Sequence, residues 1–300
     1  MRFPALSETA IERCIPGITR VSPPLQGGQK MVFPCLVNGN RYALMVMFLN
    51  GDRAHGPRSA QSGALISAAE ARAQREVSIM RRCRNPHLAA PGTIDVTVTD
   101  IDGQPVVYFT EEWVEGDDLR KILRGKGPLP FADVVRLGID VARAIDALWS
   151  ERIVHRDVKP GNIVRRSETG DFVLLDMGSA IDLNAPVLPI RSGRMPGTRM
   201  YFSPERVSSS GAFALDHRSD LFSLGIVLYE ATTGVHPFAF PAADDVELLA
   251  RIKHRTPLRP SSFQPRVPFR LSAIIMRLLA KSPARRYSTC GQLVKALESC

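Results

Sequence analysis

The chain has 300 residues, of which 44% are hydrophobic, and its 39 basic and 30 acidic side chains give a net charge of +9. That hydrophobic share allows a sizeable core, in one large domain or two smaller ones. No apolar run reaches the roughly 18 residues that cross a bilayer, and the first residues lack the apolar core of a secretory signal. We therefore expect a cytoplasmic protein that does not span a membrane.

The basic residues are scattered along the chain, and no aromatic residues alternate with them as a platform for stacking bases. This arrangement disfavours nucleic acid as a partner, whereas an acidic protein partner or substrate suits the positive charge. The cysteines show no paired spacing, which is typical of reduced thiols in a cytoplasmic protein. They are Cys14, Cys35, Cys83, Cys290 and Cys300.

Residues 1–20 are expected to form a leader that packs on the domain, with a short amphipathic stretch at Ser7–Cys14. The segment that follows alternates β-type runs with polar turns, which is typical of a small antiparallel sheet. Asn38-Gly39-Asn40 between the first two runs is a hairpin signal. The predicted strands are Met31–Val37, Arg41–Phe48, Thr93–Thr99 and Val106–Thr110.

Between the second and third of these strands the sequence predicts a loop and then one helix. Asn50–Ser62 is rich in Gly, Ser and Arg, which indicates a mobile loop. Ala68–Arg84 places Ala73, Val77 and Met80 at helical spacing with charges between them, which indicates an amphipathic helix.

The remainder of the chain has a helical pattern. An apolar stripe predicts a helix over Phe131–Ser150, and the strongly apolar stretch Ser219–Thr233 predicts a buried helix. Further helices are expected at Ala243–His254, Phe269–Ala280 and Thr289–Leu297, and a proline-rich connection joins the first two of these.

The most informative stretch is His155-Arg156-Asp157-Val158-Lys159-Pro160-Gly161-Asn162, which places an acid, a cation and an amide on one tight turn. Phosphoryl transfer needs this set, because Asp157 can accept a proton from an attacking hydroxyl and Lys159 can neutralise the moving phosphate. Asn162 can hold a metal ion, and Asp176 in Asp176-Met177-Gly178 supplies a second metal-binding carboxylate. The spacing of the acids disfavours the alternative, a polar turn without a function.

This pairing resembles the catalytic loop and the metal-binding motif of protein kinases. Further pieces follow in the order of that family: Ser203-Pro204-Glu205, then the stretch 219–225, then Ser282–Arg286. The resemblance implies a buried ion pair between Glu205 and Arg286. It also implies that Asp220 accepts hydrogen bonds from the backbone of the catalytic loop.

The resemblance implies an α+β fold with two lobes, one protein kinase domain overall. Residues 21–113 would form a small antiparallel β lobe with one main helix, and residues 114–300 a larger, mostly helical lobe. The implied activity is transfer of the ATP γ-phosphate, with Mg²⁺, to a protein. Lys159 and Thr198 favour Ser or Thr over Tyr as the acceptor, because they resemble residues of the serine/threonine kinases.

The resemblance also assigns the residues around the nucleotide. Glu76 matches the acid on the helix of the small lobe, with Glu70 as the alternative. Glu111 falls at the position that guards the back of the nucleotide pocket. The residues expected to contact the nucleotide are Gly27, Gly28, Lys30, Val32, Ala43, Glu112, Val114, Asp118 and Val164.

Two departures from the family pattern concern the phosphates. In the glycine-rich loop only Gly27 keeps its place, and Lys30 stands at the third glycine position. More importantly, Met45 occupies the position of the lysine that joins the phosphates to the acid of the helix. Losing one such preorganised donor is expected to cost at least about 10²–10³ in rate.

Three readings of Met45 are open. Met45 could be an engineered change that silences an otherwise complete kinase. Lys30 could supply the missing charge, as in the kinases that lack the strand lysine. The chain could also be a natural pseudokinase that binds nucleotide as a regulatory module.

Overall fold

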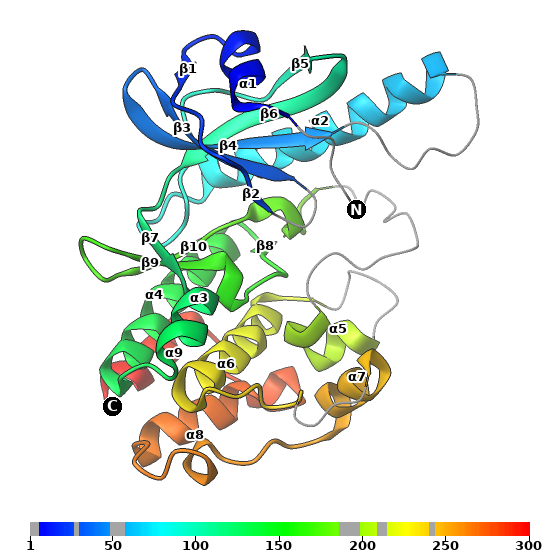
Figure 1. Cartoon of the computed structure of the whole chain (residues 1–300). Coiled ribbons are helices and arrows are strands. Elements are labelled where there is room, and N and C mark those ends of the chain that lie inside the picture. The colour runs from blue at the N-terminus through cyan, green and yellow to red at the C-terminus, as the bar shows by residue number, and fades with distance from the viewer. Residues whose placement is uncertain (1–5, 27–29, 49–57, 186–198, 209–214, 240–243) are drawn as a thin grey trace. The chain divides into compact units, whose positions relative to one another are not determined.

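The computed structural model describes residues 6–26, 30–48, 58–185, 199–208, 215–239 and 244–300, with backbone alone at 26 and 58–67 (Figure 1). The chain divides into two compact units. Unit 1 comprises Met1–Arg84 and Ala89–Trp113, and unit 2 comprises Asn85–Leu88 and Val114–Cys300. Unit 1 carries an antiparallel sheet and unit 2 is mostly helical, so the predicted α+β class is confirmed.

The sheet of unit 1 is antiparallel throughout, with the strand order β1-β3-β4-β6-β5 and with β2 beside β3. Its hairpin between β3 and β4 turns at Asn38 and Gly39, which have φ of +49° and +80°. An Asn-Gly pair adopts such angles at little cost, as the sequence predicted. The strands are Ile18–Thr19 (β1), Leu25–Gln26 (β2), Met31–Val37 (β3), Asn40–Phe48 (β4), Thr97–Ile101 (β5) and Gln104–Glu112 (β6).

Two helices belong to unit 1, α1 (Glu8–Cys14) and α2 (Arg58–Arg82). Helix α1 begins at the cap Ser7, whose hydroxyl accepts a hydrogen bond from the Ala10 N–H. Helix α2 begins ten residues before the predicted Ala68, so the expected loop is wrong over residues 58–62, while residues 50–57 lie outside the described part. Several alanines in this stretch favour helix, and they outweigh the single glycine.

The two faces of the sheet have different roles. One face carries Phe33, Leu44 and Tyr108, which pack in a common core with residues of α1 such as Ile11. The residues that precede the predicted kinase lobe therefore contribute to the core of unit 1. The other face carries Val32, Met45 and Phe109, which stand opposite one another on β3, β4 and β6.

Seven helices are described in unit 2, and the sequence predicted five of them. The helices α4 (Phe131–Ser150) and α6 (His217–Thr233) form its centre, and α6 is buried on nearly all sides. The others are α3 (Leu119–Lys126), α5 (Pro204–Ser208), α7 (Asp245–His254), α8 (Phe269–Leu278) and α9 (Cys290–Glu298). The short helices α3 and α5 were missed, because neither is long enough to show an apolar period.

Short strands position the predicted catalytic loop in unit 2. The strands β10 (Phe172–Leu174), β9 (Ile163–Arg166) and β7 (Gly116–Asp118) form one antiparallel sheet, and β8 (Ile153–Val154) pairs with β11 (Ile181–Asp182). The predicted loop therefore runs from the end of β8 to the start of β9. Among the described residues, no helix is both long enough and apolar enough to cross a membrane.

Candidate active site

The loop between β8 and β9 is held in place by hydrogen bonds to a side chain of α6. Asp220, near the start of α6, accepts hydrogen bonds from the backbone N–H groups of His155 and Arg156, both at 2.8 Å. This is the contact that the sequence predicted. Burial raises the pKa of Asp220, which is 1% exposed. The two backbone donors fix the loop immediately before Asp157.

The imidazole of His155 ties the loop to the segment after β10. The Asp157 N–H donates to His155 Nδ1 at 3.2 Å, so the proton of the neutral ring resides on Nε2. His155 Nε2 then donates to the Leu175 carbonyl at 3.1 Å. Because Leu175 precedes Asp176, this fully buried ring holds the two predicted acidic segments together.

The predicted catalytic residues lie together in this loop. Lys159 Nζ lies 2.6 Å from Asp157 Oδ2, and Asn162 Nδ2 donates to the same oxygen at 3.0 Å and to the Asp157 carbonyl at 2.9 Å. Asp157 is 6% exposed and Asn162 is 8% exposed, so both side chains are held in defined positions. A hydroxyl that approaches Asp157 would therefore meet an acceptor and a cation in one place.

The β9–β10 hairpin brings Asn162 and Asp176 to the same end of two paired strands. Ile163 stands opposite Leu174, and the Leu175 N–H donates to the Asn162 carbonyl at 2.8 Å. Asp176 adopts a φ of +67°, and its carboxylate accepts a hydrogen bond from the Gly178 N–H. This left-handed conformation is uncommon for a residue other than glycine and is a mark of functional positions.

The chemistry of these two side chains fits Mg²⁺. Asn162 donates both of its described amide hydrogen bonds to Asp157, which leaves its carbonyl oxygen as a ligand. Together with the Asp176 carboxylate it offers the oxygen ligands that a hard cation prefers. Mg²⁺ takes few protein ligands and completes its shell with water and phosphate oxygens, so two side chains suffice.

Unit 1 holds a buried ion pair on the sheet face that carries Met45. Lys30 precedes β3 and its Nζ contacts Glu76 Oε1 of α2, while the same Nζ lies 5.7 Å from the centre of the Phe109 ring. Lys30 is 9% exposed and Glu76 is 2% exposed. Met45 itself is 3% exposed and stands opposite Phe109 in the sheet. Glu76 of α2 therefore pairs with a cation even though position 45 carries no lysine.

The residues expected around the nucleotide are distributed over both units. In unit 2, Val114 and Val164 belong to one small apolar cluster, and Asp118 stands opposite Val164 in the sheet and caps α3. In unit 1, Val32 and Ala43 lie on the same sheet face as Met45. Glu112 ends β6, and its carboxylate accepts from the Ala90 N–H. Gly27 and Gly28 lie outside the described residues.

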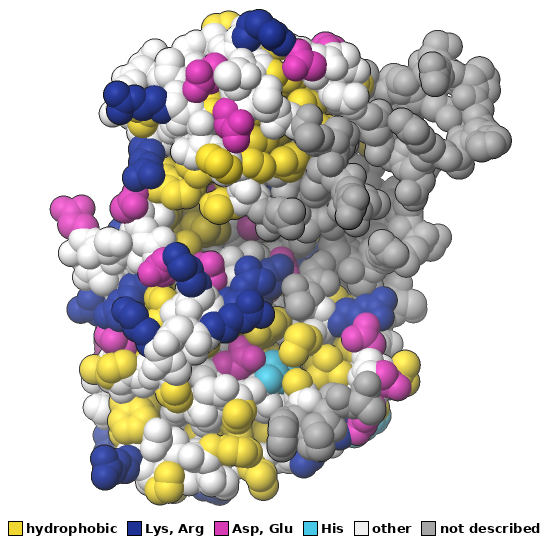
Figure 2. Space-filling model, viewed as in Figure 1, with side chains coloured by type: hydrophobic (Ala, Val, Ile, Leu, Met, Phe, Trp, Pro, Cys, Tyr) yellow, Lys and Arg dark blue, Asp and Glu magenta, His cyan; other side chains and the backbone are white. Residues whose placement is uncertain are grey.

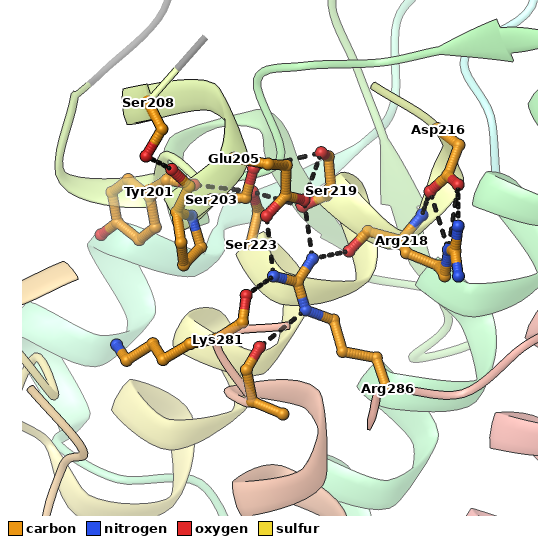
Figure 3. Close-up of polar contacts among 12 residues, drawn as sticks. Tyr201, Ser203, Glu205, Ser208, Asp216, Arg218, Ser219, Ser223, Lys281 and Arg286 are labelled. Atoms are coloured by element: carbon orange, nitrogen blue, oxygen red, sulfur yellow. Dashed lines mark hydrogen bonds and ion pairs between the residues drawn. The ribbon is translucent and has the colours of Figure 1, made fainter. Parts of the chain in front are cut away.

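The ion pair between Glu205 and Arg286 is present, as the sequence predicted (Figure 3). Arg286 donates to both carboxylate oxygens, at 2.7 and 2.8 Å, from a side chain that is fully buried. Ser219 Oγ donates to the same carboxylate at 2.7 Å. Burial alone would raise the pKa of Glu205, but the hydrogen bonds and charge of Arg286 lower it. The pair joins α5 to α6 and to the turn before α9.

Sequence reasoning missed Arg206 and the contact between Tyr201 and Glu230. Arg206 donates to the Arg156 carbonyl of the catalytic loop and lies 3.6 Å from the centre of the Phe202 ring. Tyr201 donates to Glu230 at 2.8 Å, and burial raises the pKa of Glu230 to about 7. The only signal for Arg206 is its place after Ser203-Pro204-Glu205. Thr198 lies outside the described residues.

Comparison with known proteins agrees with this geometry. The chain is 34% identical over 230 residues to a probable serine/threonine-protein kinase of Clostridium perfringens, which covers 76% of this chain and 31% of that protein. It is 36% identical over 227 residues to the serine/threonine-protein kinase PknE of Mycobacterium tuberculosis, with 75% and 37% covered. It is 30% identical over 222 residues to PknB of Mycobacterium leprae, with 74% and 34% covered.

This chain thus spans about a third of the length of the curated relatives that it matches. The family described as the protein kinase domain matches residues 60–297, which include Glu76, the catalytic loop and the Glu205–Arg286 pair. The chain belongs to the protein kinase family.

Proposed function

We propose that this chain is an active serine/threonine protein kinase domain in which Lys30 replaces the cation that the family carries at position 45. The observation that carries the proposal is the buried contact between Lys30 and Glu76. The resemblance of the catalytic loop and the relatedness to bacterial serine/threonine kinases support the reaction class. Protein Ser or Thr hydroxyls are the proposed acceptors, and ATP with Mg²⁺ is the proposed donor.

The state of Glu76 favours this reading over an engineered silencing change. A buried carboxylate that loses its only cation is strongly destabilising, about 3–5 kcal/mol for the loss of one partner. If a lysine at position 45 supplied the cation for Glu76, its replacement by methionine would impose that cost. Here Glu76 is 2% exposed and pairs with Lys30. Met45 therefore adds to an apolar strand face and does not leave Glu76 without a cation.

The chemical step follows from the loop in unit 2. Asp157 orients the acceptor hydroxyl and takes its proton as the oxygen attacks the terminal phosphorus in line; the bond from that phosphorus to its bridging oxygen breaks, and ADP leaves. Lys159, 2.6 Å from Asp157, neutralises the charge on the transferred group. Asn162 and Asp176 would hold Mg²⁺, which would supply positive charge to neutralise the phosphate oxygens. Lys30, oriented by Glu76, binds the phosphates that stay on the nucleotide.

Radiolabel transfer from ATP in the presence of Mg²⁺ tests the proposal in four proteins: the unchanged chain, Lys30→Met, Met45→Lys, and the double variant. We expect transfer by the unchanged chain and a loss of about 10²–10³-fold in Lys30→Met, because one preorganised donor is removed. The double variant should regain part of that loss. Asp157→Ala serves as the inactive control.

The other readings give different patterns. If Met45 is a silencing change, the unchanged chain is inactive and Met45→Lys alone restores transfer. If the chain is a nucleotide-binding regulatory module, neither change produces transfer, although ATP and Mg²⁺ raise the melting temperature. Equal transfer by the unchanged chain and Lys30→Met would refute the role of Lys30 but not the kinase activity.

A further inference from the structure

The positive charge of this chain is concentrated in one segment. Residues 248–297 hold eleven Lys and Arg side chains and no Asp or Glu. The other 250 residues hold 28 basic and 30 acidic side chains, which nearly balance. The net charge of +9 therefore arises from this part of unit 2, which begins in α7 and runs through α8 to α9.

Five of the eleven cations have described partners within unit 2; two of them are Arg270, which donates to the Ser299 carbonyl at 2.8 Å, and Arg277, which lies 4.1 Å from the centre of the Tyr287 ring. Arg251 pairs with Glu247, and Arg286 pairs with Glu205. Lys281 donates to the Ile252 carbonyl at 2.6 Å. Eight of the eleven are exposed, and none of these eight forms an ion pair within the described part of the chain. They are Lys253, Arg255, Arg259, Arg266, Arg270, Arg277, Arg285 and Lys295.

Large apolar side chains are exposed among the first of these cations. Leu258 is 57% exposed, Phe263 is 46% exposed and Phe269 is 75% exposed. They are three of the six large hydrophobic side chains that are exposed in the described part of the chain. Figure 2 shows exposed hydrophobic side chains at the end of unit 2 where α8 lies in Figure 1. Apolar groups rimmed by charge are typical of interaction sites.

The backbone that carries these side chains is fixed to α6. The Tyr229 hydroxyl donates to the Leu258 carbonyl at 3.0 Å, and the Tyr229 and Phe263 rings meet edge to face at 6.4 Å between centres. The Gln264 N–H donates to the Pro260 carbonyl at 2.9 Å. A surface that is already ordered loses little conformational entropy when a partner binds.

We propose that this surface binds an acidic segment of another protein that also carries apolar side chains. We call it the basic–apolar surface and define it by Lys253, Arg255, Leu258, Arg259, Phe263, Arg266, Phe269 and Arg270. Four of its five cations are arginines, whose planar guanidinium groups bind carboxylates through two hydrogen bonds. Arginine and aromatic residues are also the residues enriched at protein interfaces.

The alternation of side chains favours a protein segment over a lipid surface or a nucleic acid. Leu258 is followed by Arg259, and Phe269 by Arg270, so inserting the apolar groups into hydrocarbon would draw guanidinium groups with them at a cost. A nucleic acid backbone would satisfy the arginines but offer no apolar groups to Leu258. An acidic segment with apolar side chains satisfies both kinds of group at once.

Fluorescence anisotropy with two labelled peptides tests this proposal without any activity measurement. One peptide repeats Asp-Glu-Leu-Phe, and the other has the same length and charge with Ser in place of Leu and Phe. We expect the first to bind about tenfold more tightly, because its apolar groups cover Leu258 and Phe269. Leu258→Ser/Phe269→Ser should remove that advantage and leave binding of the second peptide unchanged.

Charge variants separate local recognition from net charge. Arg255→Ser/Arg259→Ser/Arg266→Ser should weaken binding of the first peptide about tenfold, since exposed ion pairs contribute modestly each. Arg84→Ser/Arg124→Ser/Lys126→Ser removes the same charge from exposed positions outside the surface and should change binding less than about twofold. Circular dichroism checks that each variant is folded.

Three outcomes would overturn the proposal. Equal binding of the two peptides would show that the apolar groups take no part. Equal weakening by the two charge variants would show attraction by net charge alone. Tighter binding to phosphatidylserine–phosphatidylcholine vesicles or to a short DNA duplex, with displacement of the peptide, would assign the surface to a lipid or to a nucleic acid instead.

Discussion

Replacing Arg286 by methionine tests how the helical unit is held together. Arg286 is 1% exposed, and its side chain donates to both oxygens of Glu205. It also donates to the carbonyls of Arg218 at 2.7 Å, Ala280 at 2.9 Å and Lys281 at 3.1 Å. Arg286→Met keeps a similar length but removes all five of these hydrogen bonds and leaves Glu205 buried without its cation.

The expected loss in the free energy of unfolding is about 4 kcal/mol, because removing one partner of a buried ion pair costs about 3–5 kcal/mol. The hydrogen bond from Ser219 to Glu205 moderates this loss but supplies no charge. A domain that is stable by about 5–15 kcal/mol would lose a large part of its stability. Glu205→Gln/Arg286→Met removes both charges, and we expect it to lose at least about 2 kcal/mol less than the sum of the single changes.

Urea unfolding followed by circular dichroism measures these free energies at several pH values. Because Arg286 lowers the pKa of Glu205 below its usual 4.5, the pair stabilises the fold above that pH. This stability is lost as the pH falls through the lowered pKa. The difference between the unchanged chain and Arg286→Met should therefore narrow in acid. A loss below about 1 kcal/mol at neutral pH, or additive losses in the double variant, would refute the reasoning.

Further changes in unit 2 test other contacts by the same unfolding assay. Asp220→Ala removes both hydrogen bonds that anchor the catalytic loop and should cost about 3 kcal/mol; a cost below about 1 kcal/mol would contradict that role. Burial raises the pKa of Glu230 to about 7 from 4.5, so the unchanged chain should lose about 3 kcal/mol as the pH rises from about 5 to 8, and Glu230→Gln should abolish that loss. Gly225→Ala should cost about 2 kcal/mol, because its new β-carbon would lie 2.7 Å from a leucine β-carbon of α8. Gly125→Ala, in α3, would add a β-carbon with no atom of a neighbouring element within 4 Å, and it should stabilise the fold by up to about 1 kcal/mol. Equal effects of the two glycine changes on the free energy of unfolding would refute the packing argument.

The sequence predicted the elements whose pattern is periodic and long. The apolar stripe of α4 and the buried α6 were found with ends that differ by at most two residues. The start of α2 was wrong, because the sequence reasoning gave more weight to glycine and serine in Asn50–Ser62 than to the alanines beyond them. Helix α3 was missed, since eight residues give too few turns to show a period.

Contacts between distant segments were predictable only where a motif fixed both partners. Glu205 and Arg286, 81 positions apart, were paired through the family resemblance, and so was Asp220 with the loop. The contact of Arg206 with the loop was missed, because no spacing rule links a side chain in a short helix to a backbone carbonyl 50 positions earlier. The sequence left the role of Lys30 open, because burial next to Glu76 is a property of the folded sheet.

The position of Lys30 determines which part of the sheet is joined to α2. β4 lies inside the sheet, with β3 on one side and β6 on the other, so a lysine at position 45 would join α2 to the middle of that strand. Lys30 instead lies directly before β3 and directly after residues 27–29, and it pairs with Glu76 in α2. A rotation of α2 that keeps the pair between Glu76 and Lys30 would therefore also move the start of β3. The orientation of the helix and the position of this cation would then change together.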